Sequence, residues 1–252
     1  MNKIVLFISL CILLNINYLF AQKTFINEEQ TWLALFNQTR FSDKLGIWLD
    51  VQARLKDDFI KDMSVLIAPR IGLTYYVNDD VKLTAGYAYI NNYPDGARVI
   101  SQPEHRPWQQ IQWHTKYPKI RLMQWMRLEE RYRQKIKNNN AFEDGYNFNY
   151  RVRYNFLLTT PLSKKGFAPG GLQLVLNNEI HINLAKNIVY NIFDQNRFFA
   201  GLSYQMTKMS NVQFGYMKVF QQLPAGNQFK NINAIRVFYF HNFDLRQTEV
   251  EK

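Results

Sequence analysis

After residue 21 the sequence alternates between apolar and polar residues, and the polar residue is very often arginine. In the segment 119–136 one parity is apolar, with Leu122, Met126, Leu128, Tyr132 and Ile136. The other parity is charged, with Arg121, Arg127, Glu129, Arg131, Arg133 and Lys135. Successive side chains of a strand point to opposite faces, so this strand has one apolar and one charged face. A strand between lipid and a polar lumen must read this way, which predicts an all-β, antiparallel transmembrane barrel with an arginine-rich lumen.

The first residues, 1–21, are typical of a secretory signal peptide. Lys3 supplies the positive start, 4–14 the apolar stretch, and 19–21 the cleavage site. The apolar stretch is too short to span a bilayer as a helix, which needs about 20 residues. We therefore expect an exported mature chain, residues 22–252, that forms a single domain.

Composition narrows the range of partners. The formal charge of +11 falls by one when Lys3 is removed, and so basic a chain suits an anionic partner. Export argues against nucleic acid, which leaves phosphate, other small anions and anionic lipid. Cys11 is the only cysteine and lies in the expected signal peptide, so the mature chain has neither disulfides nor thiolate chemistry.

Ten segments between residues 45 and 243 carry the strand pattern: 45–56, 63–77, 81–92, 104–117, 119–136, 146–160, 171–185, 196–207, 211–222 and 230–243. In the second of them Val65 and Ile67 fall on the outward, apolar parity. Residues 29–41 look like an eleventh strand, but bacterial single-chain barrels have even strand numbers. We therefore predict 10 or 12 strands, with 29–41 packed in the lumen or paired with a strand that the pattern does not reveal.

The connections alternate in length, as expected for periplasmic turns and extracellular loops. Short turns are expected at 42–44, 78–80, 117–119 and 208–210, and longer loops near 93–103, 137–144, 186–194 and 223–229. The connection at 161–170 is long for its side, and the one at 57–62 is short for its side. This alternation predicts an outer-membrane location with the longer loops outside the cell.

Matching faces of neighbouring strands must pair, so the expected turns set the register of the charged residues. A tight turn at 117–118 places Arg106 opposite Glu129 and Glu104 opposite Arg131. A loop centred near 140 places Glu129 opposite Arg151 and Arg127 opposite Arg153. A connection centred near 166 places Arg153 opposite Glu179 and Arg151 opposite His181. Together these residues form a continuous charged belt, our candidate site: Glu104, Arg106, Arg127, Glu129, Arg131, Arg151, Arg153, Glu179, His181 and Arg197.

The charged belt has two interpretations. A narrow barrel is often closed by its own side chains, and paired Arg and Glu side chains would seal it and lock strand register. Alternatively, arginine outnumbers carboxylates on the lumen parity, and the surplus could bind an anionic ligand or line an anion path. The segment 193–197 would then lie near the outer mouth, where a ligand could enter.

Catalytic motifs are weak in this chain. The four histidines, of which His105 falls on the outward parity, are scattered without a ligand pair at metal spacing. His181 and Ser203 share the lumen parity on neighbouring strands, but a serine hydrolase needs them in contact with a third, orienting group. We therefore expect no catalytic residue, no metal and no cofactor.

Five strings carry a resemblance: E-H-R-P-W-Q-Q at 104–110, R-L-E-E-R at 127–131, Y-R-V-R-Y at 150–154, N-E at 178–179 and F-D-Q-N-R at 193–197. Over roughly residues 28–243 the chain resembles an uncharacterised outer-membrane family, a domain of unknown function common in Bacteroidetes-type bacteria. The resemblance implies an outer-membrane β-barrel of a Gram-negative cell and implies no known activity.

The sequence thus favours a porin-like or binding barrel for small anionic solutes, or a sealed structural barrel, with the lipid bilayer and lipopolysaccharide as its surroundings. Two alternatives stay open: a membrane-embedded enzyme that acts on lipid or lipopolysaccharide, and a structural partner in an envelope complex. The alternation of apolar and polar residues does not indicate an oligomeric state.

Overall fold

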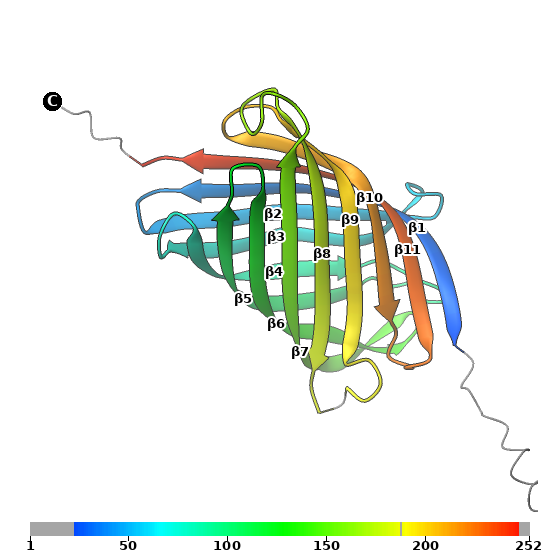
Figure 1. The fold of residues 1–252 in the computed structure, drawn as a ribbon. Helices are drawn as coiled ribbons and strands as arrows, with labels where there is room; N and C mark the ends of the chain where they lie inside the picture. The colour runs from blue at the N-terminus through cyan, green and yellow to red at the C-terminus, as the bar shows by residue number, and fades with distance from the viewer. Residues whose placement is uncertain (1–22, 187, 247–252) are drawn as a thin grey trace, which may run out of the picture.

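The structure, a computed structural model, describes residues 23–186 and 188–246, and the expected signal peptide at 1–21 lies outside them. This described part forms a closed barrel of eleven strands (Figure 1). The strands are β1 (Thr24–Arg40), β2 (Leu45–Lys56), β3 (Asp62–Tyr76), β4 (Val81–Asn92), β5 (Gln102–Lys116), β6 (Arg121–Asn138), β7 (Ala141–Pro161), β8 (Leu172–Leu184), β9 (Phe193–Gln205), β10 (Ser210–Gln222) and β11 (Gln228–Asp244). No helix in this part of the chain is long and apolar enough to cross a membrane.

Each strand pairs antiparallel with the next one in sequence, but β1 and β11 pair in parallel and close the barrel (Figure 1). In an up-and-down barrel with an odd number of strands, the first and last strands run in the same direction, so a parallel seam is unavoidable. The predicted count of 10 or 12 strands is therefore wrong. Residues 29–41 neither pack in the lumen nor pair with an unrecognised strand, because β1 lies between β11 and β2.

The barrel has two ends that differ in their connections. We call the end with 41–44, 77–80, 117–120, 162–171 and 206–209 the turn end, and the end with 57–61, 93–101 and 223–227 the loop end. The long loop predicted near 137–144 is wrong, because β6 and β7 continue into a hairpin that leaves only Asn139 and Asn140 between them. The long connection at 162–171 and the short one at 57–61 lie on the predicted sides.

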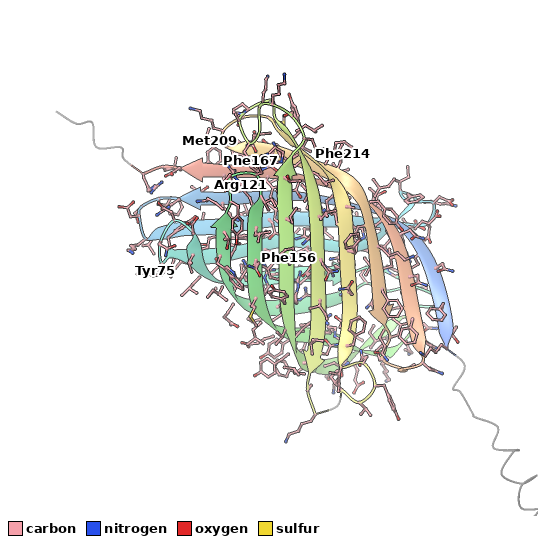
Figure 2. All side chains as sticks on the ribbon, viewed as in Figure 1. Tyr75, Arg121, Phe156, Phe167, Met209 and Phe214 are labelled. Carbon is pink, nitrogen blue, oxygen red and sulfur yellow. The ribbon has the colours of Figure 1, made fainter. Side chains whose placement is uncertain are left out.

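The two faces of the strands follow the predicted alternation over most of the barrel. Leu128 is 37% exposed on the outer face, whereas Arg127 and Glu129 beside it are 3% and 0% exposed in the lumen. In Figure 2 the side chains of Tyr75 and Phe214 project from the outer surface, and both are exposed. Polar side chains are thus collected inside the barrel and apolar ones outside.

One stretch of β3 breaks the alternation. The register between β3 and β4 shifts between Ile67 and Arg70, where the chain contains the cis bond Ala68–Pro69. Such a bulge adds a residue to one strand and reverses which side chains face inward before it. Ile67 is therefore 2% exposed inside the lumen and Val65 packs beside it, which corrects their predicted outward position.

Apolar side chains also occupy part of the lumen, in two clusters on opposite walls. One cluster comprises Trp32, Val175, Phe199, Met217, Val219, Ile232 and Ala234. The other comprises Trp48, Ile67, Ala88, Ile90 and Trp108. The lumen is therefore a packed interior at these positions, and its charged side chains gather between two apolar walls.

Candidate functional site

Glu129 on β6 is the centre of the charged belt. Its carboxylate accepts hydrogen bonds from Arg151 Nη2 at 2.6 Å and from Arg153 Nη1 at 2.6 Å. Arg106 Nη1 lies 3.6 Å from the same carboxylate. Glu129 is fully buried, so this one anion holds three arginines from β5 and β7 together.

Two further carboxylates extend the belt to both sides. Glu104 on β5 is fully buried and accepts from Arg106 Nη2 and from Arg131 Nε, each at 2.7 Å. Glu179 on β8 accepts from Arg153 Nε at 2.7 Å and lies 3.0 Å from His181 Nε2. Arg197 Nη1 also approaches Glu179, at 3.5 Å. Arginine forks that bind carboxylates in this way are among the strongest side-chain hydrogen bonds.

The predicted register across β6 and β7 is confirmed, because Glu129 faces Arg151 and Arg127 faces Arg153. Across β5 and β6 the prediction is wrong by two residues: Glu129 faces Trp108. The cause is the connection 117–120, which is longer than the assumed tight turn. Arg106 still pairs with Glu129, because its long side chain reaches diagonally along the lumen.

The predicted register across β7 and β8 is also wrong by two residues. Arg153 faces His181, and Arg151 faces Asn183. The connection lies at 162–171, one residue further along the chain than the assumed 161–170, and a shift of one residue in the centre of a connection moves the facing residue by two. The expected ion pair of Arg153 with Glu179 forms along the diagonal instead. All ten predicted belt residues face the lumen; Arg127, the one without a carboxylate partner, donates from Nε to Gln110 Oε1 at 2.8 Å.

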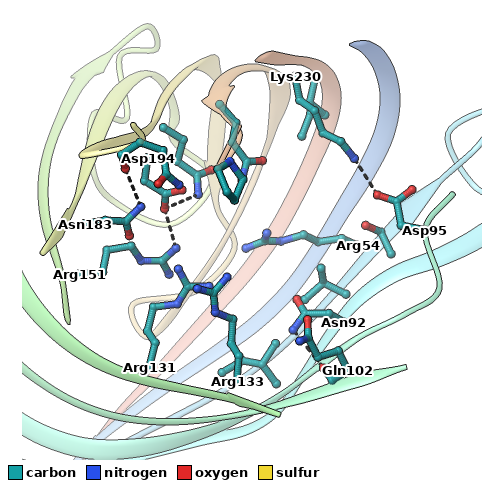
Figure 3. A pocket seen from close by; sticks show the side chains of 18 of the residues that line it. Arg54, Asn92, Asp95, Gln102, Arg131, Arg133, Arg151, Asn183, Asp194 and Lys230 are labelled. Carbon is teal, nitrogen blue, oxygen red and sulfur yellow. Dashed lines mark hydrogen bonds and ion pairs between the residues drawn. The ribbon is translucent and has the colours of Figure 1, made fainter. Parts of the chain in front are cut away.

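The sequence analysis missed Asp194. A register shift between His181 and Ile182 inserts this residue as a bulge in β9, and its carboxylate points into the lumen. There it accepts from Arg151 Nη1 at 2.9 Å (Figure 3). A strict alternation assigns Asp194 to the outer face, and bulges often redirect a side chain in this way.

Arg236 on β11 was also missed, because apolar residues surround it on the inner parity of its strand. It donates from Nη2 to Gln213 Oε1 at 2.7 Å and from Nη1 to Asn177 Oδ1 at 3.3 Å. Its guanidinium carbon lies 3.6 Å from the centre of the Phe199 ring. Arg236 therefore bonds to amides and an aromatic face.

Four lumen arginines, Arg54, Arg127, Arg133 and Arg236, have no carboxylate within 4.0 Å among the described residues. Arg54 lies over Trp32, with 3.7 Å between guanidinium carbon and ring centre, and Arg127 lies over Trp108 at 4.3 Å. A cation over an aromatic face gains about 0.5–2 kcal/mol, which offsets only part of the cost of burying a charge. These four groups carry part of the positive charge that the lumen leaves unneutralised.

A cavity of about 660 Å³ opens at the loop end (Figure 3). Ten cationic side chains and three carboxylates line it. In Figure 3 Arg54 from β2 and Arg131 and Arg133 from β6 point into the same space. The cavity therefore has a strong surplus of positive charge and is open at the loop end.

The mouth of this cavity carries a small ion-pair cluster. Lys230 Nζ lies 2.8 Å and Lys56 Nζ 3.3 Å from the carboxylate of Asp95, which belongs to the loop 93–101. Burial opposes ionisation of this carboxyl, but the two lysines outweigh burial and hold the pKa of Asp95 below its ordinary value. The cluster ties the loop to β2 and β11.

A second cavity, of about 520 Å³, lies at the turn end. Its wall includes the aromatic side chains of Phe36, Trp48, Trp125, Phe238 and Phe240. Arg127 and Arg236 line it as well, whereas Glu179 is the one carboxylate among its lining residues. The charged belt lies between the two cavities.

The remaining candidate catalytic and metal-binding side chains do not form a site together. His105 points outward, as its parity predicted, and contacts the ring of Tyr146. Ser203 faces Gln173 whereas His181 faces Gln195, which places them about 26 Å apart along β9 at about 3.3 Å per residue. Among the described residues no three His, Cys, Asp or Glu side chains are grouped as metal ligands.

Comparison with known proteins gives one match. A family model described as "Protein of unknown function (DUF2490)" matches residues 29–230, which is most of the chain. No curated protein matches the chain.

Proposed function

Since the chain belongs to the DUF2490 family of proteins of unknown function, we propose its role from its geometry: it is an outer-membrane β-barrel that binds a small anionic solute in the loop-end cavity. The observation that carries this proposal is the partly buried charge of Arg54 and Arg133 in that cavity, which no carboxylate of the described residues neutralises. Burying such a charge without an anion is unfavourable, so an anionic solute that pairs with it would bind tightly.

The outer face of the barrel supports the membrane location. Leu73, Phe214 and Ile235 are among many large apolar side chains that are exposed on outward positions of their strands. Soluble monomers rarely expose a continuous apolar surface of this extent. Lipid around the barrel would cover it, and a closed barrel leaves no strand edge unpaired in the bilayer.

The charged belt favours binding over conduction. Glu104 and Glu129 are fully buried, and Arg151 and Arg153 are hydrogen-bonded to Glu129 from the next strand. These ion pairs join the neighbouring strands β5, β6 and β7 on the inner wall between the two cavities. In this arrangement a solute enters the loop-end cavity from outside and stops at the charged belt.

The proposal is tested by calorimetric titration of the refolded mature chain in detergent with inorganic phosphate and with citrate. Arg54→Gln and Arg133→Gln should each weaken binding about tenfold or more, because a hydrogen bond to a charged group contributes about 1.5–3 kcal/mol. Arg246→Gln, which removes a charge at the turn end, is the matched control. Equal affinities of all four proteins, or no binding by the parent, would overturn the proposal.

Planar-bilayer recordings in a salt gradient separate binding from transport. We expect no stable current steps from folded, inserted protein. Reproducible anion-selective steps would instead favour a pore whose surplus arginines set its ion preference.

A further inference from the structure

We propose that the turn-end cavity is a second, independent site, which binds an organic anion with an apolar body. Phosphate and citrate, the solutes considered for the loop end, have no such body. The inference rests on the aromatic wall of this cavity and on two arginines that no carboxylate neutralises.

The aromatic wall is built by three neighbouring strands. Phe36 on β1 stacks on Phe240 of β11, with ring centres 4.9 Å apart and an interplanar angle of 9°. Phe36 also meets Trp48 of β2 edge-on at 6.1 Å and Phe238 of β11 at 5.4 Å. Polar solutes gain nothing from such a wall, whereas an aromatic ring or an acyl chain buries apolar surface against it.

Two arginines next to this wall can receive an acidic group. Arg127 and Arg236 are 3% and 5% exposed. Their hydrogen-bond acceptors are neutral amides, Gln110 for the first and Gln213 with Asn177 for the second. A carboxylate or sulfonate of a ligand would supply the missing charge.

The charge of the whole cavity agrees with an anionic ligand. Eight lysine and arginine side chains line it, against the single carboxylate of Glu179. That carboxylate is already shared by Arg153, His181 and Arg197. The volume of about 520 Å³ lies within the range of about 300–1,000 Å³ that is usual for small-molecule sites.

The first test uses naphthalene-1-sulfonate as the probe and follows the tryptophan fluorescence of the full mature barrel in detergent. Trp48 and Trp125 line the cavity and should be quenched as it fills. The uncharged naphthalene-1-sulfonamide, which has the same ring, should bind at least tenfold more weakly. Quenching of equal strength by both probes would overturn the proposal, because it would show partition into the micelle or an apolar surface.

The decisive variant is Gln213→Glu. The amide oxygen of Gln213 lies 2.7 Å from Arg236 Nη2, so the new carboxylate would neutralise this arginine from inside the protein. The variant should stay folded and lose at least tenfold in affinity for the sulfonate, and Arg236→Gln should show the same loss. Unchanged affinity in a folded Gln213→Glu protein would overturn the proposal.

Cross-controls separate this site from the proposed loop-end site. Arg54→Gln should leave sulfonate affinity unchanged, and Gln213→Glu should leave phosphate affinity unchanged. Competition with decanoate then identifies the apolar body: displacement of the sulfonate indicates an acyl chain that fits the site, and its absence indicates an aromatic acid. Loss of sulfonate binding in Arg54→Gln would contradict the existence of two separate sites.

Discussion

At the scale of single residues, the lumen depends on a few carboxylates that are each shared by several arginines. Glu129 holds Arg106, Arg151 and Arg153, and Glu104 holds Arg106 and Arg131. Removing one member of a buried ion pair costs more than the pair contributes, because the remaining charge stays buried without a partner. Replacing one of the few carboxylates should therefore destabilise the barrel strongly. Replacing one of the more numerous arginines should destabilise it less.

This reasoning predicts that Glu129→Gln lowers the free energy of unfolding by about 3–5 kcal/mol. The matched control is Glu130→Gln on the next residue, which points outward and has a single hydrogen bond, at 3.4 Å to Gln109. Denaturant unfolding in detergent, followed by the gel mobility of folded and unfolded protein, measures both. Equal stability of the two variants would contradict the pairing around Glu129.

Sequence reasoning could place most lumen side chains, because alternation follows directly from strand geometry. It identified the ten belt residues and the outward position of His105. It failed for Val65, Ile67 and Asp194, since each lies beside a bulge and alternation contains no signal for an extra residue. Arg236 escaped because its strand presents apolar side chains on both faces.

At the scale of elements, the mouth of the loop-end cavity is held by the loop 93–101 through Asp95. The lysines Lys56 and Lys230 hold the pKa of this carboxyl below its ordinary value of 3.8. A group with a lowered pKa stabilises the folded arrangement above the unfolded pKa, and this contribution is lost as the pH falls through the folded pKa.

We therefore predict that the loop 93–101 stays attached at neutral pH and detaches progressively below a pH of about 3.8. Hydrogen exchange of this loop at a series of pH values, corrected for intrinsic rates, measures the change. In Asp95→Asn the loop should exchange quickly at every pH. A loop whose protection is the same at pH 7 and pH 3 would contradict the role of Asp95.

The parallel seam is the element that the sequence analysis could not predict. The rule of even strand numbers led to 10 or 12 strands, whereas β1 pairs with β11 along its whole length. Its outward residues Leu33 and Val237 face each other across the seam and are both exposed. Alternation alone does not reveal which strands are neighbours when they lie at opposite ends of the chain.

The seam predicts a specific cross-link. In a Cys11→Ser background, Leu33→Cys with Val237→Cys should form a disulfide on mild oxidation, because facing residues lie within the Cα separation of about 4.4–6.8 Å that a disulfide requires. Leu33→Cys with Tyr239→Cys is the control, since it is displaced by two residues along the strand. The cross-linked chain is recognised on a non-reducing gel by its faster migration. A larger cross-linked fraction in the control than in the test pair would contradict the register.

At the scale of the whole molecule, the barrel has a charged interior and an apolar exterior. The lumen contains the charged belt, and the outer positions of the strands present residues such as Leu73, Tyr75 and Phe214 (Figure 2). A soluble barrel would be expected to have the opposite distribution. The proposed membrane location therefore means that lipid, and not water, surrounds the apolar exterior. This can be tested by substitutions at single outward positions.

We predict that Phe214→Arg impairs insertion into phospholipid vesicles by about 2–4 kcal/mol if the residue faces the bilayer midplane, and by less toward the interface. The matched control is Asn211→Arg on the same strand, because Asn211 lines the turn-end cavity and its replacement adds the same charge to the lumen side. Vesicle flotation combined with gel mobility measures the folded, inserted fraction of each variant. If Phe214→Arg inserts as well as Asn211→Arg, the outer face of β10 does not contact lipid and the proposed membrane location fails. A defect confined to the outward variant follows only if lipid surrounds the barrel, since in water an added surface charge would be neutral or favourable.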